Sequence, residues 1–248
     1  MNWFPILLAT ACSSAPPAVE PVLERAIVAS RTTFGTMTSM GPFRLDARTS
    51  TTTRSESGEK HEDESYSLRW QDESRWQVIR RRDGERTEEL RVWDNRAWRA
   101  GGNGALLLRG DAEPYRASLA VNWDPWASAI GSWNQSVGFR LEATEQVEGR
   151  TALVYSLEPL AGAPSRKGNE LVSVEGKVWI DETTAARLVG DVKLVTIRHG
   201  REQSVELRFS VTEVGGDPGV EAPPGAVAPS QRSEAPVPPP SDFGGSTP

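Results

Sequence analysis

The sequence predicts an α+β domain built on one strongly curved antiparallel sheet of about eleven strands, an incomplete β-barrel. An N-terminal helix and helices inserted mid-chain are expected to cover its concave face. Three observations predict this fold. Short segments of alternating apolar and polar residues fill most of residues 43–212. The connections between them are too short for parallel crossovers. A sheet of this many strands must also curl or close, because large twisted sheets do not stay flat.

The first predicted element is an amphipathic helix of about four turns near the N-terminus. Charged side chains such as Glu24 and Arg25 lie off its apolar face. A helix of this kind buries its apolar stripe, so we expect it to cover the sheet. That stripe is formed by Val19, Val22, Leu23, Ala26, Ile27 and Ser30.

A first block of strands follows this helix. Phe43 to Thr49 alternates apolar and polar residues and runs on into a Thr- and Ser-rich stretch that ends at Thr53. Asp83-Gly84 is a strong signal for a two-residue hairpin, and Asp94 to Arg96 marks another hairpin turn. The remaining strands predicted in this block are residues 66–70, 75–78, 90–93, 97–99 and 105–109.

Two helices are predicted between the strand blocks. Asp111 can cap the first helix, which would carry Tyr115, Leu119 and Trp123 at spacings of four. Asp124-Pro125 starts the second helix, with Asp as the cap and Pro in the first turn. The second helix would carry Trp126, Ile130 and Trp133.

The second strand block alternates more regularly than the first. Its clearest strand, residues 205–212, places four apolar side chains on one face and polar side chains on the other. The turn from Asp181 to Thr184 separates two of its strands. The other strands predicted here are residues 140–147, 151–157, 172–180 and 188–194.

The N-terminus resembles an export signal. Trp3 to Ala11 is a short apolar run that ends in small residues, too short to span a bilayer. Leu8-Ala9-Thr10-Ala11-Cys12 resembles the lipobox of bacterial lipoproteins, which implies acylation of Cys12 after export and attachment to a membrane. The absence of Asp after Cys12 implies the outer membrane. An ordinary signal peptide, or a buried N-terminal segment with Cys12 incidental, is the alternative.

These patterns divide the chain into four parts. Residues 1–11 are predicted as the signal peptide and residues 12–17 as a tether that carries the lipidated Cys12. The domain is expected to span residues 18–218. The remainder, residues 219–248, is predicted as a disordered Pro-rich tail, because it has no hydrophobic periodicity with which to form a core.

Composition argues against several classes of function. The net charge of −6, from 28 basic and 34 acidic residues, argues against nucleic-acid binding. One cysteine and two histidines leave little material for a metal site, and we predict neither metal nor cofactor. Hydrolase, zinc-protease and phosphate-loop motifs do not occur, so we predict no enzyme. Arg80-Arg81-Arg82 could contact anionic lipid headgroups, although a solvated hairpin arm is the simpler interpretation.

Tryptophans are the candidate ligand-binding residues. Rings from a curved sheet and from helices that cross it would line the same concave space, which could hold one apolar ligand. The alternative is that the rings fill the core and leave no cavity. The candidate cavity-lining residues are Trp70, Trp76, Trp93, Trp98, Trp123, Trp126, Trp133 and Trp179.

The order of elements resembles the LolA/LolB lipoprotein-carrier superfamily, which includes LppX-type and RseB-type domains. The features nearest to that family are Trp179-Ile180-Asp181, which opens a hairpin, and residues 209–214, which close the sheet before a Pro-rich exit. The resemblance implies a curved half-barrel in which helices cover an apolar cavity for acyl chains. It implies a periplasm-facing or surface-exposed envelope lipoprotein that carries a lipid or acylated ligand. Alternatively, it implies an RseB-like sensor or assembly module that binds a protein partner.

Overall fold

The computed structural model describes residues 21–32, 35–100, 104–116, 125–133, 135–160 and 169–226. Within these residues, eleven strands form one antiparallel sheet, which confirms the predicted fold class. The helical elements are α1 (Pro21–Thr32), α2 (Gly35–Thr38), a turn at residues 113–116, α4 (Pro125–Ala129) and the 3-10 helix η1 (Gly131–Trp133). The strands are β1 (Phe43–Ser55), β2 (Gly58–Asp72), β3 (Arg75–Arg82), β4 (Glu85–Trp93), β5 (Arg96–Ala100), β6 (Leu106–Asp111), β7 (Val137–Val147), β8 (Arg150–Pro159), β9 (Asn169–Asp181), β10 (Arg187–Arg198) and β11 (Arg201–Thr212).

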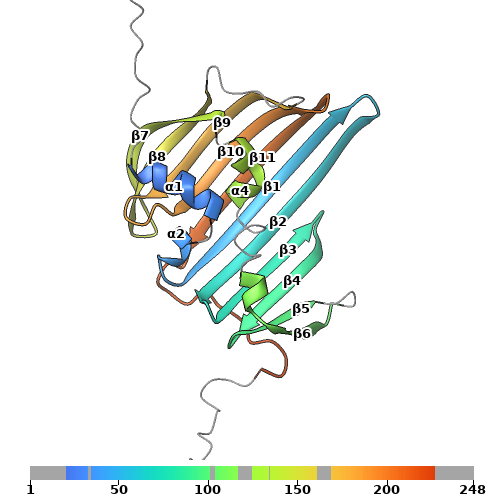
Figure 1. The fold of residues 1–248 in the computed structure, drawn as a ribbon, viewed down its shortest axis with the longest axis vertical. Helices are drawn as coiled ribbons and strands as arrows, with labels where there is room; N and C mark the ends of the chain where they lie inside the picture. The colour runs from blue at the N-terminus through green and yellow to red at the C-terminus, as the bar shows by residue number, and fades with distance from the viewer. Residues whose placement is uncertain are drawn as a thin grey trace, which may run out of the picture.

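The sheet is open, and it consists of two meanders joined at its centre. Its strand order is β6-β5-β4-β3-β2-β1-β11-β10-β9-β8-β7, so the first strand pairs with the last. The two edges, β6 and β7, are consecutive in the chain, and residues 112–136 connect them (Figure 1). Ten inter-strand spacings would separate these edges by about 48 Å in a flat sheet. The described part of this connection, residues 125–133, lies against β1 and β11 near the middle of the sheet.

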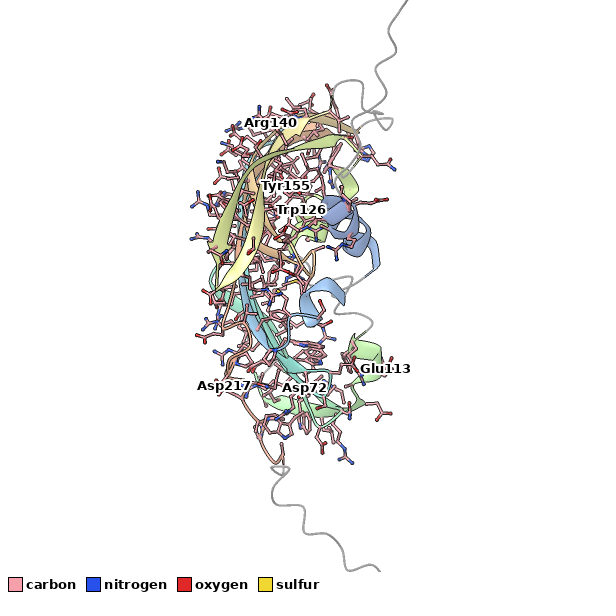
Figure 2. All side chains as sticks on the ribbon, turned by 90° about the vertical axis from the view of Figure 1, so that its left-hand side faces the viewer. Asp72, Glu113, Trp126, Arg140, Tyr155 and Asp217 are labelled. Carbon is pink, nitrogen blue, oxygen red and sulfur yellow. The ribbon has the colours of Figure 1, made fainter. Side chains whose placement is uncertain are left out.

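The sheet bends toward the side that carries the helices (Figure 2). We call this concave side the inner face and the opposite side the outer face. Contacts join α1 to β9, and α4 to β11 and β1. No helix among the described residues is long and apolar enough to cross a membrane.

Alternation along each strand explains which side chains form the core. Leu45 pairs with Val211, and Ala47 pairs with Phe209, and all four are buried on the inner face. The same parity continues through both halves of the sheet. Further buried inner-face residues are Phe43, Leu68, Trp70, Trp76, Val78, Leu90, Val92, Val174, Val178, Leu188, Val192, Leu194, Val205 and Leu207.

One close approach in the core requires a glycine. A Cβ atom added to Gly190 of β10 would lie 2.2 Å from Cε1 of Phe209, which sits opposite on β11. The Phe209 ring therefore packs directly over the Gly190 backbone. This arrangement lets a large ring lie flat at the centre of the curved sheet.

The chain continues past β11 across the outer face. We call residues 213–226 the strap; Figure 2 shows Asp217, in its first half, on the side away from the helices. Pro218 and Pro223 of the strap are buried. The sequence prediction ends the domain at residue 218, whereas the structure places residues 219–223 against the sheet.

Candidate ligand-binding site

The inner face of β9, β10 and β11 is a continuous apolar surface. Three rows of paired residues cross it, and each row is buried beneath the helical elements. Because hairpin connections keep these strands in register, side chains of one parity all face the same way. The rows comprise Val174, Leu194 and Val205; Val192 and Leu207; and Val178, Gly190 and Phe209.

Trp126 of α4 is the centre of the covering layer. Its side chain is 1% exposed. The Phe139 ring of β7 lies 6.0 Å from it, centroid to centroid, with a tilt of 32°. The Arg187 guanidinium lies 5.0 Å from the Trp126 centroid, a cation–π contact inside the core. These two contacts hold α4 on the sheet.

Arg187 also fixes α1. It is buried, and its Nη2 donates a hydrogen bond to the backbone carbonyl of Ala26. This bond joins Arg187 to the backbone of α1. It also offsets part of the free-energy cost of removing the guanidinium from water. One side chain thus holds both helices that cover the apolar rows.

A second arginine repeats the arrangement over η1. The Arg198 guanidinium lies 5.5 Å from the Trp133 centroid, and its Nη2 donates to Ser132 Oγ at 3.2 Å. Arg187 and Arg198 are the first and last residues of β10. The two ends of one strand therefore contact Trp126 and Trp133, the tryptophans of the covering that the structure describes.

The turn between β9 and β10 anchors the other side of α1. Arg25 donates to the backbone carbonyls of Thr183 and Glu182 at 3.0 and 3.2 Å. Asp181, 1% exposed, holds this turn by accepting from the Thr184 backbone at 2.6 Å and from Arg150 Nε at 2.6 Å. Burial alone would raise the pKa of Asp181. The hydrogen bonds from Arg150 and Thr184 outweigh burial and hold that pKa below its usual value.

The inner face changes chemistry at β1. Along one cross-strand row, Val192 and Leu207 are followed by Thr49, then Glu64, then Arg82. Apolar side chains therefore give way to a hydroxyl and then to charges across five adjacent strands. A ligand lying along this row would meet an apolar surface at one end and a polar surface at the other.

A second aromatic group lies at the opposite end of the inner face. Phe43, Trp70 and Trp76 stack in sequence, with centroids 6.5 and 6.4 Å apart and interplanar angles of 21° and 19°. These rings contact one another directly. They fill the core beneath β1, β2 and β3.

The structure divides the predicted cavity residues between the two faces. Trp70, Trp76, Trp126 and Trp133 belong to the inner side. Trp123 lies outside the described residues. The lining of a cavity by these side chains stays a prediction. The residues that alternation places on the outer face are Trp93, Trp98 and Trp179, the last donating to Glu145 Oε2 at 2.8 Å.

An open groove of about 410 Å³ lies elsewhere, where β1, β11 and β10 adjoin. Its side chains include Asp46, Arg48, Asp191, Arg208 and Ser210, all of the parity that faces outward. Gly190 and Phe209 also line it, so the groove lies on the outer face directly opposite one of the apolar rows.

Sequence reasoning missed the charged residues that hold the helices. Regular alternation would place Arg187 and Leu188 on opposite faces of β10. A register shift between Arg187 and Val189 leaves both Arg187 and Leu188 buried. Arg187 is recognised as an inner-face residue only from this shift. Asp181 was recognised as part of a turn, and its burial is what adds the structural role.

No protein-family model matches the chain, and no curated protein matches it. Solved structures that are similar include a LolA superfamily protein from Nitrosomonas europaea, with 9% identity and a TM-score of 0.26 over 76% of this chain and 91% of that one. The Mycobacterium tuberculosis lipoprotein LppX has 12% identity and a TM-score of 0.27 over 74% and 93%.

The Pseudomonas aeruginosa MucA/MucB complex is similar with 17% identity and a TM-score of 0.26, over 85% of this chain and 58% of that one. This chain thus spans a little over half of the length of that protein. Members of the superfamily that the order of elements resembles are among these structures. At such TM-scores the likenesses carry no argument, and the fold description rests on strand order and register.

Proposed function

We propose that the protein is a bacterial envelope lipoprotein that binds an acyl chain of a lipid or acylated protein on the inner face, without catalysing a reaction. The supporting observation is the continuous apolar inner face of β9, β10 and β11 beneath short helices. Acylated Cys12 anchors the protein to the outer membrane in this proposal. The ligand moves reversibly between a membrane and the sheet.

Helix α1 is the part of the covering that moves. Among its described side chains, Leu23 and Ala26 are buried. Burial of one leucine contributes about 1.5–3 kcal/mol, and each buried methylene of an acyl chain contributes about 0.8 kcal/mol. About two to four methylenes can therefore replace the contact that Leu23 makes. Trp126, held on both sides, keeps α4 in place while α1 opens.

The change of chemistry at β1 orients the ligand. The acyl chain lies along Val192 and Leu207, and the polar end of the lipid faces Thr49 and Glu64. Beside them, Arg80 donates to Glu64 through Nε and Nη2 at 2.6 and 2.7 Å. This ion pair gives the polar end donors and acceptors.

Lipid uptake tests the proposal. We expect full-length protein purified from cell envelopes to retain lipid in native mass spectrometry, and the delipidated protein to bind a fluorescent fatty acid. Arg187→Met removes the bond to Ala26 and should release the fatty acid faster. Arg208→Met, on the outer face, is the matched control and should not change release. Lipid-free protein that takes up no fatty acid contradicts the proposal.

The anchor has its own test. Cys12→Ser should move the protein from the membrane fraction to the soluble fraction, and the mature wild-type N-terminus should carry acyl mass on Cys12. A wild-type N-terminus without acyl groups contradicts this part alone.

A protein partner is the second candidate function, and one edge of the sheet favours it. Leu107 and Leu108 of β6 are 48% and 51% exposed, and β6 pairs only with β5 among the described strands. An exposed apolar edge strand can add a strand from a partner. Leu108→Lys should abolish photocrosslinking to such a partner in cells, whereas Leu141→Lys on edge strand β7, 49% exposed, should not. Equal crosslinking by both variants contradicts it.

A further inference from the structure

The strap follows a defined path over the outer face. Its start is fixed by a hydrogen bond from the Gly215 backbone N–H to the Pro42 carbonyl at 2.8 Å. From there it passes behind the ends of β2, β3 and β4 (Figure 1). Arg69 of β2 donates to the Gly219 carbonyl at 2.7 Å. On β4, Arg91 Nη2 lies 3.0 Å from Glu221 Oε2.

The surface beneath the strap is held together by contacts that do not involve the strap. Glu89 of β4 is 1% exposed and accepts a hydrogen bond from Arg91 Nε at 2.7 Å. Arg86 binds the other oxygen of the same carboxylate. Gln77 of β3 is equally buried and completes the group. Glu89 thus fixes one side of the Arg91 guanidinium and leaves its other nitrogens directed at the strap.

The strap is held mainly through its backbone. The carbonyls of Gly219, Glu221 and Ala222 accept bonds from arginines, and the Glu221 N–H donates to Gln77 Oε1 at 3.5 Å. One acidic side chain and two buried prolines, Pro218 and Pro223, supply the remaining contacts. Backbone bonds with side-chain contacts at intervals are how proteins recognise extended peptides, and proline favours the extended form.

We propose that the outer face of β2, β3 and β4 is a peptide-binding groove that accepts an extended acidic segment with flanking prolines from a partner protein. The strap is its tethered occupant and defines the chemistry of the ligand: a Glu that meets Arg69 and Arg91, with a proline on either side. The groove is distinct from the apolar inner face, so this binding does not depend on lipid.

The strap is suited to exchange. Gly215 has a φ of 76°, and Gly216 follows it, so the strap leaves β11 through a flexible pair of residues. The Glu221 side chain is 59% exposed, and ion pairs with an exposed partner contribute little to stability. Tethering gives the strap an effective concentration on the order of 1 mM, which a partner must overcome.

A labelled peptide of residues 216–226 tests the groove by fluorescence anisotropy with full-length protein. Glu221→Gln combined with Pro223→Ala weakens the strap and leaves the groove intact. We expect this variant to bind the peptide about tenfold more tightly than wild type does, since about 1.4 kcal/mol of strap binding is lost. The matched control peptide carries Gln in place of Glu221 and should bind more weakly.

Arg69→Gln in the same background removes one recognition group and should abolish the gain. Arg69 is used because Arg91 also supports buried Glu89, and a change at Arg91 could unfold the domain. The proposal is overturned if a scrambled peptide binds as tightly, or if Arg69→Gln leaves binding unchanged. It is also overturned if the weakened variant binds no peptide, or if wild type forms dimers through strap exchange without binding peptide.

Discussion

Two segments cross the sheet, one on each face, and they are held by different forces. The described part of the inner crossing, residues 125–133, is fixed by Trp126 and Trp133, large buried rings that lie against arginines. The strap is fixed by backbone hydrogen bonds and by the half-exposed Glu221. Burial of a large apolar side chain contributes a few kcal/mol, whereas an exposed ion pair contributes less than about 1 kcal/mol. The inner crossing is therefore part of the core, whereas the strap is bound to the outer surface of the sheet.

The largest difference between the two crossings is expected at Trp126. Trp126→Ala should lower the free energy of unfolding by about 3–5 kcal/mol, because it leaves a cavity and a buried guanidinium without its ring. Urea denaturation followed by circular dichroism measures this loss. Trp179→Ala, at a half-buried outer-face ring, is the matched control and should cost less than half as much. Equal losses would remove the distinction between the faces.

Asp181 gives a smaller effect that depends on pH. Asp181→Asn should cost about 2 kcal/mol at pH 7, below the usual 3–5 kcal/mol for a buried pair because Arg150 is 25% exposed. The folded-state pKa of Asp181 is lowered from 3.8, so its contribution is present above that value and is lost as the pH falls through the folded-state pKa.

The stabilities of wild type and Asp181→Asn should therefore converge as the pH is lowered below about 4, measured by thermal unfolding across that range. Asp191→Asn, at an exposed ion pair with Arg208 on the outer face, should change stability little at any pH. A difference between wild type and Asp181→Asn that persists at low pH would mean that the Asp181 charge is not what holds the turn.

Alternation and turn chemistry predict all eleven strands, because most strands bury one face and the hairpins have a Gly, Asp or Asn signal. The edge strands β6 and β7 are mostly exposed on both faces. The pairing of β1 with β11 joins residues far apart in sequence, and no local pattern records it. Parity alone could have placed Trp93 and Trp98 on the outer face, since their neighbours Val92 and Ala97 are buried inside. The sequence interpretation grouped tryptophans by residue type and overlooked parity.

The strap was missed for a different reason. Residues 219–226 carry no hydrophobic period, and their prolines and glycines are typical of a disordered segment. What orders them is a set of backbone carbonyls that meet Arg69 and Arg91. Backbone recognition leaves almost no trace in the sequence of the recognised segment, so composition could not predict it.

The smallest expected effect separates the strap from the core. Glu221→Gln should lower the free energy of unfolding by less than about 1 kcal/mol, and the difference should shrink further at high salt, since the pair is screened. Hydrogen exchange should show faster exchange at the Glu221 amide and unchanged exchange in β3 and β4. Glu202→Gln, which breaks an exposed pair with Arg54 at the far end of the sheet, should leave strap exchange unchanged. A loss above about 2 kcal/mol, with faster exchange in β3, would make the strap a structural part of the core, and both faces would then be held in the same way.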